Sequence, residues 1–399
     1  MKFNFVNLPD ELSRPFAEIK PHLQFDVCQS GMAVTVQKNN VGPKMIVENN
    51  QIVIEYHKIP EFFRMLTMLP NRSETDGIYE EFPAHEDLCL MADCSRNAVF
   101  NIDGAKKMIR FLALMGFTSF MLYTEDTYEV PEYPFFGYIR GRFSQEELQE
   151  IDAYSLQFGI EMIPCMQVLA HLEATLRWTA FKDIVDTGNI LLVGEEKTYE
   201  FIEAMIRSCR KCFHTNRIHI GMDEAHLIGS GKYLEKNGYR DRSEIILEHL
   251  ERVMEICKKY DFKPMMWSDM FFRLGGKGLK GYVDYDVRVN LDELISEKVP
   301  KGIQQVFWDY YNAGEEFYAV NIDKHKKYLD EETIFAGGVW LWSGHAPHFA
   351  RSLRNTVPAL EACKKKGVKE ILATVWVNGS YACHMLSLPG LAWYADFDY

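Results

Sequence analysis

The feature that most constrains the fold of this chain is an alternation of strand-like and helix-like segments from about residue 87 onward. Short apolar runs of this kind are typical of strands that are buried on both faces of a parallel sheet. The strand-like runs are Leu88–Met91, Phe117–Tyr123, Ile160–Gln167, Ile218–Met222, Phe262–Trp267, Ile303–Trp308, Ile334–Trp340 and Glu370–Trp376. The amphipathic helical stretches between them include Ile102–Met115, Ser144–Gln157, Thr198–Cys212, Ser243–Tyr260 and Arg351–Lys366.

Eight strands that alternate with helices predict an α/β fold, a closed (β/α)8 TIM barrel. A doubly wound open sheet is the competing fold, but no GxGxxG turn follows the first strand. Helix boundaries support the reading: Ser144 followed by Glu147 is a capping signal, and Gly116, Gly159 and Gly367 stand at helix ends.

The segment before the barrel has a different pattern. Met32–Val36 and Gln51–Tyr56 alternate in polarity, and turn-rich residues separate them. They predict a small antiparallel sheet, covered by a helix around Glu61–Leu69. We therefore expect a small α+β N-terminal domain at 1–84 and the barrel at 85–399.

The composition excludes several classes of partner. A net charge of −13 disfavours nucleic acid and anionic membrane surfaces, so we expect neither partner. The N-terminus lacks the apolar core of a signal peptide, and the nine cysteines are irregularly spaced. These features predict a cytoplasmic protein with reduced thiols. They do not decide between a monomer and a homodimer.

Polar and tryptophan clusters end nearly every predicted strand. In a (β/α)8 barrel the carboxyl ends of the strands form one rim, where working residues gather. We expect these clusters to line one pocket, with tryptophan faces suited to stacking on a sugar ring. The strand-end clusters include Gln167 and Asp269, and the site candidates chosen at the rim are Arg96, Glu125, His171, Asp223, Glu224, Trp267, Trp308, Tyr310, Trp342, Trp376 and Asn378.

The segment Arg217–Glu224 is the centre of this prediction. It reads as a strand that ends in two adjacent carboxylates, Asp223 and Glu224. Neighbouring residues of an extended chain point to opposite sides. They cannot easily flank an anomeric carbon as the usual glycosidase carboxylates do, at about 5–9.5 Å from each other.

An alternative chemistry needs only one catalytic acid from the protein. A 2-acetamido group of the substrate can attack the anomeric carbon through its carbonyl oxygen and form an oxazolinium intermediate. Glu224 would then protonate the leaving oxygen, and Asp223 would orient the acetamido group. A like charge beside Glu224 should keep it protonated to higher pH, as a general acid requires.

These residues resemble family 20 of the glycoside hydrolases, the β-N-acetylhexosaminidases. His219, Gly221, Asp223 and Glu224 match the family's H-x-G-x-D-E motif in full. The weaker matches are Asp93–Arg96 to D-x-x-R, Thr124–Asp126 to T-D-D, His171 to a histidine after strand three, Trp267 and Tyr310 to acetamido-pocket residues, and Gly337–Trp342 to G-G…L-W.

The resemblance implies roles for these residues. Glu224 would be the general acid/base, Asp223 would hold the acetamido nitrogen and Tyr310 its oxygen. Arg96 would bind outer hydroxyls, and His171 with Glu125 would support Glu224 through hydrogen bonds. The same resemblance makes Trp267, Trp308 and Trp342 the walls around the acetamido methyl group.

Two family positions differ here. Gly344 and Asn312 stand where the family commonly has acidic residues that contact outer hydroxyls. Trp376 and Asn378 could take over that contact, so the preference between the gluco and galacto epimers is open.

The expected function is therefore an exo-acting, retaining β-N-acetylhexosaminidase that needs no cofactor and no metal. Its expected partner is an oligosaccharide or glycoconjugate that ends in N-acetylhexosamine. Two alternatives stay open. One is a metal-dependent barrel hydrolase with His171, His219, Asp223 and Glu224 as ligands, and the other is a non-catalytic sugar-binding barrel.

Overall fold

The barrel strands close into a ring in the computed structural model, which describes residues 1–399 apart from 97, 277, 282, 292–297, 331 and 379–382. All neighbouring strands are parallel, in the order β12-β13-β14-β15-β16-β7-β8-β9. The strands are β7 (Asp87–Asp93), β8 (Ser119–Tyr123), β9 (Glu161–Cys165), β12 (Arg217–His219), β13 (Lys263–Trp267), β14 (Gln304–Trp308), β15 (Ile334–Gly338) and β16 (Glu370–Val375). The predicted (β/α)8 barrel is confirmed.

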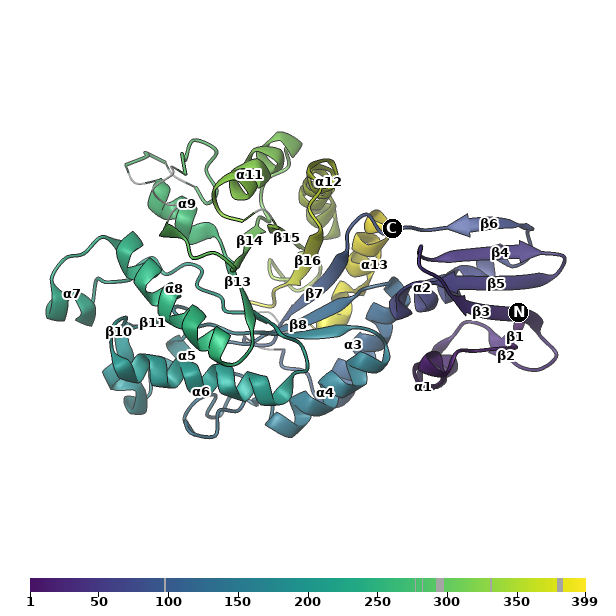
Figure 1. The fold of residues 1–399 in the computed structure, drawn as a ribbon, viewed down its shortest axis with the longest axis horizontal. Coiled ribbons are helices and arrows are strands. Elements are labelled where there is room, and N and C mark those ends of the chain that lie inside the picture. The colour runs from purple at the N-terminus through teal and green to yellow at the C-terminus, as the bar shows by residue number, and fades with distance from the viewer. Residues whose placement is uncertain (97, 277, 282, 292–297, 331, 379–382) are drawn as a thin grey trace.

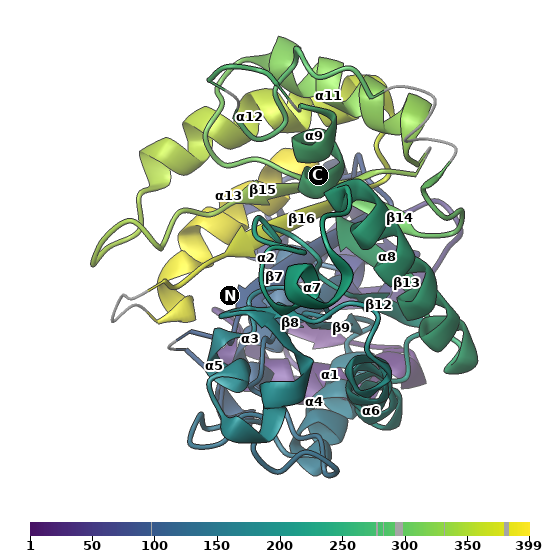
Figure 2. The same ribbon diagram turned by 90° about the vertical axis from the view of Figure 1, so that its left-hand side faces the viewer.

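Helices surround the strands, as Figure 2 shows. The larger ones are α3 (Ile102–Met115), α4 (Gln145–Gln157), α6 (Glu196–Cys212), α8 (Arg242–Lys259), α11 (Glu315–Tyr328), α12 (Phe349–Lys366) and α13 (Leu388–Asp398). Shorter elements in the loops are α5 (Glu173–Leu176), α7 (Lys232–Asn237), α9 (Asp269–Gly275), β10 (Val185–Thr187), β11 (Ile190–Leu191) and the 3-10 turns Thr179–Ile184 and His384–Ser387. No helix in the described part of the chain is long and apolar enough to cross a bilayer.

The local sequence accounts for these boundaries. The Ser144 hydroxyl accepts a hydrogen bond from the Glu147 backbone N–H at 3.1 Å, and the Glu147 carboxylate accepts one from the Ser144 N–H at 2.8 Å. This is the capping box that the sequence predicts at the start of α4. Gly116 and Gly367 end α3 and α12 with positive φ of 87° and 61°, which glycine adopts without steric cost.

A six-stranded sheet precedes the barrel and lies beside it in Figure 1. Its order is β2-β1-β3-β5-β4-β6, and α1 (Asp10–Ile19), a 3-10 turn (Lys20–His22) and α2 (Ile59–Arg72) accompany it. The strands are β1 (Lys2–Phe5), β2 (Asp26–Val27), β3 (Met32–Lys38), β4 (Lys44–Glu48), β5 (Gln51–Tyr56) and β6 (Gly77–Glu80).

The predicted antiparallel sheet is wrong in its pairing, because this sheet is mixed. β4 and β5 form an antiparallel hairpin through Asn49 and Asn50, whose φ values are 49° and 64°. β3 pairs with the other edge of β5 and is parallel to it. The alternation of polarity predicts each strand, but it carries no information about which edge the next strand joins.

The sheet region is joined to the barrel through α2, which packs against α3. Arg64 on α2 binds Glu81 at 2.6 Å and Asp396 at 3.0 Å, and its guanidinium lies over the ring of Tyr399. The buried pair His85–Asp398 connects the linker before β7 to the last helix at 2.5 Å. A boundary between residues 84 and 85 stays a prediction.

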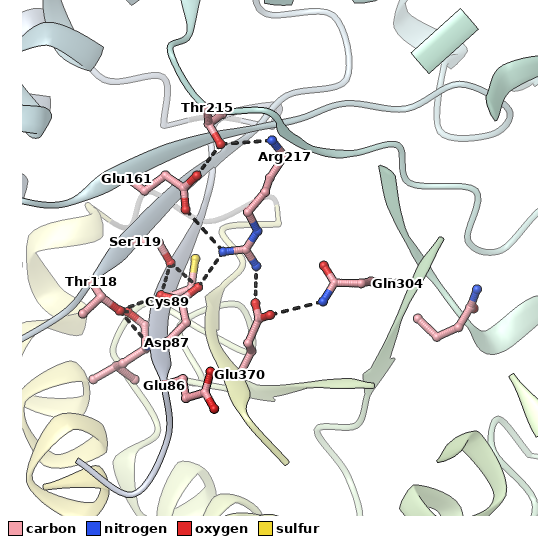
Figure 3. Close-up of polar contacts among 12 residues, drawn as sticks. Glu86, Asp87, Cys89, Thr118, Ser119, Glu161, Thr215, Arg217, Gln304 and Glu370 are labelled. Atoms are coloured by element: carbon pink, nitrogen blue, oxygen red, sulfur yellow. Dashed lines mark hydrogen bonds and ion pairs between the residues drawn. The ribbon is translucent and has the colours of Figure 1, made fainter. Parts of the chain in front are cut away.

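At the end of the barrel opposite the rim, an ion-pair cluster around Arg217 connects the strands. Arg217 begins β12, and its guanidinium contacts Asp87 of β7 at 3.0 Å and Glu161 of β9 at 3.3 Å (Figure 3). It also contacts Glu370 of β16, which accepts a hydrogen bond from Gln304 of β14 at 3.1 Å. The strand that carries the motif is thus tied at its start to three other strands.

Candidate active site

Ten of the eleven predicted site residues line one cavity at the carboxyl ends of the strands. Its volume is about 160 Å³, less than the roughly 300–1,000 Å³ of pockets for drug-sized ligands. Its lining is Arg96, Tyr123, His171, Asp223, Glu224, Trp267, Trp308, Tyr310, Tyr311, Trp342, Trp376 and Asn378. The cavity is therefore of the size for one small ring with polar groups on one side and aromatic walls on the other.

The motif segment is shorter as a strand than the sequence predicts. β12 ends at His219, whereas the prediction extends the strand to Met222. Gly221, Met222 and Glu224 all have positive φ, at 72°, 73° and 50°. Left-handed conformations of non-glycine residues cost about 1–3 kcal/mol each and gather at functional sites. This turn places the two acids, and hydrophobic alternation cannot reveal it.

Asp223 and Glu224 do not point to opposite sides, contrary to the prediction for an extended chain. Nε2 of His171 lies 3.2 Å from Oδ2 of Asp223 and 3.4 Å from Oε2 of Glu224. The imidazole thus occupies the gap between the carboxylates. An anomeric carbon cannot take the same place, so the two acids are not arranged as an ordinary acid–nucleophile pair.

Gln167 holds Asp223 from the end of β9. Its amide Nε2 donates to Oδ1 of Asp223 at 2.8 Å and to the hydroxyl of Tyr123 at 3.0 Å. Its Oε1 accepts a hydrogen bond from the Met222 N–H at 3.2 Å. A Cβ on Gly221 would lie 2.0 Å from this Oε1, so the glycine of the motif is what allows the amide to approach the turn.

The surroundings of Asp223 and Glu224 shift the pKa values of the two carboxyl groups in opposite directions. Burial raises the pKa of Glu224, and the charge of Asp223 raises it further. Burial alone would also raise the pKa of Asp223, but the charge and hydrogen bond of His171 and the amide of Gln167 lower it. Burial opposes the charged form of His171, yet Asp223, Glu125 and Glu224 raise its pKa to about 9. The arrangement favours a protonated Glu224 beside an ionised Asp223.

His219 is part of the packing below the site. It is fully buried, its ring lies 4.5 Å from that of Trp267, and its Nδ1 accepts a hydrogen bond from the Gly221 N–H at 3.1 Å. Burial lowers its pKa to about 3, so it is a neutral imidazole.

Aromatic rings form the opposite wall. Trp308 and Tyr310 stack with centroids 5.4 Å apart, and Tyr310 meets Trp342 edge-on at 5.4 Å. Trp340 stacks behind Trp342 at 4.2 Å, and its Nε1 donates to the Tyr310 carbonyl at 3.1 Å. A Cβ on Gly338 would lie 2.7 Å from Trp342 and 2.8 Å from Tyr310, so this contact requires glycine.

Arg96 lies at the end of β7 and reaches the cavity. Its guanidinium binds Asp93 at 3.0 Å and Glu125 at 3.5 Å, and it lies over the rings of Tyr123 and Trp376. Glu125 is the predicted residue that does not line the cavity, and it accepts a hydrogen bond from the Tyr123 hydroxyl at 3.2 Å. The predicted support of Glu224 by Glu125 becomes indirect, because Glu125 acts on His171 by charge alone.

Four residues of the site have no role in the sequence-based prediction: Tyr123 and Tyr311, and also Gln167 and Asp269, which the prediction places in the rim clusters. All four end or closely follow a predicted strand, so their position at the rim was a usable signal. Asp269 is fully buried and accepts a hydrogen bond from the Glu224 N–H at 3.1 Å. Burial and then the charge of Asp223 raise its pKa to about 8. The residue pattern places Asp269 at the rim, but it reveals neither its burial nor its hydrogen bond to the Glu224 backbone.

The fold and this site define a (β/α)8-barrel glycoside hydrolase. The chain belongs to glycosyl hydrolase family 20: the catalytic domain of that family matches residues 89–290. Hexosaminidase D of Bos taurus is 24% identical over 245 residues, which are 57% of this chain and 64% of that protein. Hexosaminidase D of Homo sapiens is 25% identical over 230 residues, or 55% of this chain and 42% of that protein.

Solved structures show the same fold. The GH20 exo-β-N-acetylglucosaminidase of Vibrio harveyi, in complex with N-acetylglucosamine, has a TM-score of 0.72 at 16% identity, covering 100% of this chain and 70% of that one. The β-hexosaminidase of Streptomyces plicatus, as a D313A mutant with GlcNAc, has a TM-score of 0.70 at 16% identity. The alignment covers 100% of this chain and 86% of that one.

Proposed function

We propose that this protein is an exo-acting, retaining β-N-acetylhexosaminidase, which removes terminal β-linked GlcNAc or GalNAc from an oligosaccharide or glycoconjugate. One observation carries the proposal: adjacent acids with opposite pKa shifts share His171, and an aromatic cavity faces them. The cavity volume of about 160 Å³ suits a single terminal ring, which an exo-acting enzyme binds. The names of the two hexosaminidase D relatives support the same activity.

The first step breaks the glycosidic bond. The acetamido carbonyl oxygen attacks the anomeric carbon, and the bond to the leaving oxygen breaks. Glu224 gives its proton to that oxygen, which leaves as an alcohol. Asp223 accepts a hydrogen bond from the acetamido N–H and stabilises the positive charge that develops on the oxazolinium ring.

The second step restores the sugar. Glu224, now a carboxylate, takes a proton from a water molecule that attacks the anomeric carbon. The bond to the acetamido oxygen breaks, and the carbonyl group forms again. Two displacements at one carbon retain its configuration, as in other retaining glycosidases.

The walls supply the contacts that position the ring. Tyr310 would donate its hydroxyl to the acetamido oxygen, and Trp267, Trp308 and Trp342 would enclose the methyl group. Arg96, Trp376 and Asn378 face the outer hydroxyls. Nε1 of Trp267 and Nε1 of Trp376 are buried donors without a partner in the described part of the chain, so a bound hydroxyl could satisfy them.

The test compares three aryl substrates. Aryl β-GlcNAc and β-GalNAc should be hydrolysed, whereas the aryl β-glucoside, which has no acetamido group, should react at least ~10³-fold more slowly. Equal rates on the glucoside would refute the substrate-assisted mechanism.

The two alternatives are weaker on this geometry. His219, one of four ligands that the metal-dependent hydrolase requires, packs under Trp267 and does not line the cavity. A sugar-binding barrel without catalysis would have no need for two acids with opposed pKa shifts. Cytoplasmic location and a homodimer stay predictions, to be checked by cell fractionation and sedimentation.

A further inference from the structure

Three side chains of the site have the composition of a transition-metal site. His171, Asp223 and Glu224 each present one ligand atom, and these atoms lie within 4.8 Å of one another. A histidine nitrogen with carboxylate oxygens is a usual zinc donor set, and catalytic zinc sites have three protein ligands and one open position.

The distances suit a tetrahedral ion. Zinc bonds of about 2.0–2.1 Å imply roughly 3.3–3.4 Å between any two ligand atoms of a tetrahedron. Nε2 of His171 lies 3.2 Å from Oδ2 of Asp223 and 3.4 Å from Oε2 of Glu224. The remaining edge joins the two carboxylates, and the Glu224 side chain, 41% exposed, can rotate to adjust it.

Two of the three ligands are held in place by the fold. His171 lies in the loop after β9 with a φ of 57°, its side chain is only 16% exposed, and its Nε2 faces Oδ2 of Asp223 at 3.2 Å. Gln167 fixes the other oxygen of Asp223 at 2.8 Å, so Oδ2 is left facing the imidazole.

We propose that this cluster binds a zinc-type divalent cation reversibly, and that the bound ion inhibits the enzyme by competing with substrate. The inhibition rests on the proposed function, because the ion takes Glu224 and Asp223 away from the leaving oxygen and the acetamido nitrogen. Binding itself does not depend on the proposed function: it needs the three ligands and releases the proton of His171. Magnesium should bind poorly, since it prefers six oxygen ligands at about 2.0–2.1 Å and keeps its waters.

The test measures binding and inhibition separately on chelator-treated protein. Calorimetry with Zn²⁺ should show one site, and Mg²⁺ should show none. Zn²⁺ at ten times its measured dissociation constant should lower kcat/KM about elevenfold with kcat unchanged, and excess chelator should restore the rate.

Variants locate the site. His171→Gln and Asp223→Asn should each weaken calorimetric Zn²⁺ binding at least tenfold, with folding checked by thermal denaturation. His226→Gln, which removes the exposed histidine two residues beyond Glu224, is the matched control and should bind as the parent does.

The outcomes separate the two proposals. Zinc binding that persists in His171→Gln, or that is lost in His226→Gln, would overturn the site. An absence of zinc binding would show that the cluster is an ion pair only. Binding at this cluster in a protein that hydrolyses none of the aryl N-acetylhexosaminides would support the site and refute the proposed function. Activation of chelator-treated enzyme by zinc would overturn the inhibitory role.

Discussion

The buried carboxyl group of Asp269 accepts a hydrogen bond from the backbone N–H of Glu224, with 3.1 Å between Oδ2 and N. Glu224 itself has a left-handed φ of 50°, so its backbone needs such an anchor. The other oxygen of Asp269 lies 3.5 Å from Nε1 of Trp308 in the aromatic wall. One carboxyl group thus connects the turn at Glu224 to the aromatic wall on the opposite side of the cavity.

Asp269→Ala should lower kcat by about ten- to a hundredfold, because small displacements of a catalytic group have effects of that size. It also leaves the partly buried Glu224 N–H without its acceptor, which should reduce the free energy of unfolding by about 1–3 kcal/mol. Asp269→Asn keeps an acceptor oxygen and is the matched control. Steady-state kinetics and urea titration measure both effects, and equal losses in the two variants would contradict the anchoring role.

The raised pKa of Asp269 predicts that the stability of the protein falls as the pH rises. Burial and Asp223 raise its folded-state pKa to about 8, above an unfolded value of about 4. The folded state therefore holds the proton more tightly, and the contribution of this group to stability falls as pH rises between those values. Relative to Asp269→Asn, which does not titrate, the parent should lose up to about 1.4 kcal/mol per pH unit across this window. A difference that grows in the opposite direction would be inconsistent with a buried neutral acid.

Glu224 and Asp223 should respond differently to the leaving group. Glu224→Gln should lower kcat/KM by about 10²–10⁴ for an alkyl or sugar leaving group, which needs protonation, and much less for a nitrophenyl group. Asp223→Asn should impair both kinds of substrate, since the acetamido group attacks in either case. The measurement is a series of aryl substrates with graded leaving-group pKa. If Asp223→Asn is as active as the parent, the role assigned to Asp223 is wrong.

Much of the fold follows from sequence because its signals are local. The helix Ile102–Met115 has the predicted ends, since Asn101 caps it and Gly116 ends it. The eight buried strands are recognisable as apolar runs between helices. The pairing of β3 with β5 was not recoverable, because it depends on contacts that no local pattern encodes.

The site, too, has residues that the sequence predicts and residues whose roles depend on tertiary contacts. Residues such as Arg96 and Trp267 could be predicted from their place at strand ends, and the motif singled out Asp223 and Glu224. The left-handed turn at Met222 and Glu224 could not be predicted, because bulky or charged residues are rarely found there without tertiary support. Gln167 and Asp269 act through hydrogen bonds to that turn, so their roles become visible only with the turn in place.

His171→Gln should shift the pH profile of kcat/KM to higher pH. The His171 charge lowers the pKa values of both Asp223 and Glu224, so its removal raises both. The acidic limb, where Asp223 must lose its proton, and the alkaline limb, where Glu224 must keep its proton, should therefore both move upward. Profiles on an aryl N-acetylhexosaminide from about pH 4 to 9 measure the limbs. A downward shift of either limb would contradict the ion-pair arrangement.

Gly338→Ala should damage the aromatic wall. The added methyl group would lie 2.7 Å from Trp342 and 2.8 Å from Tyr310, and neither ring can move without losing its stacking partner. We expect a loss of about 1–3 kcal/mol in stability and a rise in KM. Gly344→Ala is the matched control, because a Cβ there meets nothing within 4 Å. Thermal denaturation and kinetics of the two variants, side by side, test whether the wall tolerates the methyl group.

Arg217 offers a test of the far end of the barrel. Its guanidinium is shared by Asp87, Glu161 and Glu370, and its side chain is only 17% exposed (Figure 3). Arg217→Met removes the cation and leaves three partly buried carboxylates facing one another, which should reduce the free energy of unfolding by about 3–5 kcal/mol. Arg217→Lys keeps the charge but cannot bind three strands at once, so its loss should be smaller. Urea titration measures the difference.

The kcat of protein that remains folded should be unchanged, because the cluster lies at the start of β12 and the acids follow its end. A fall in kcat without a loss of stability would show that this end of the barrel acts on the site, contrary to the purely structural role we assign to it.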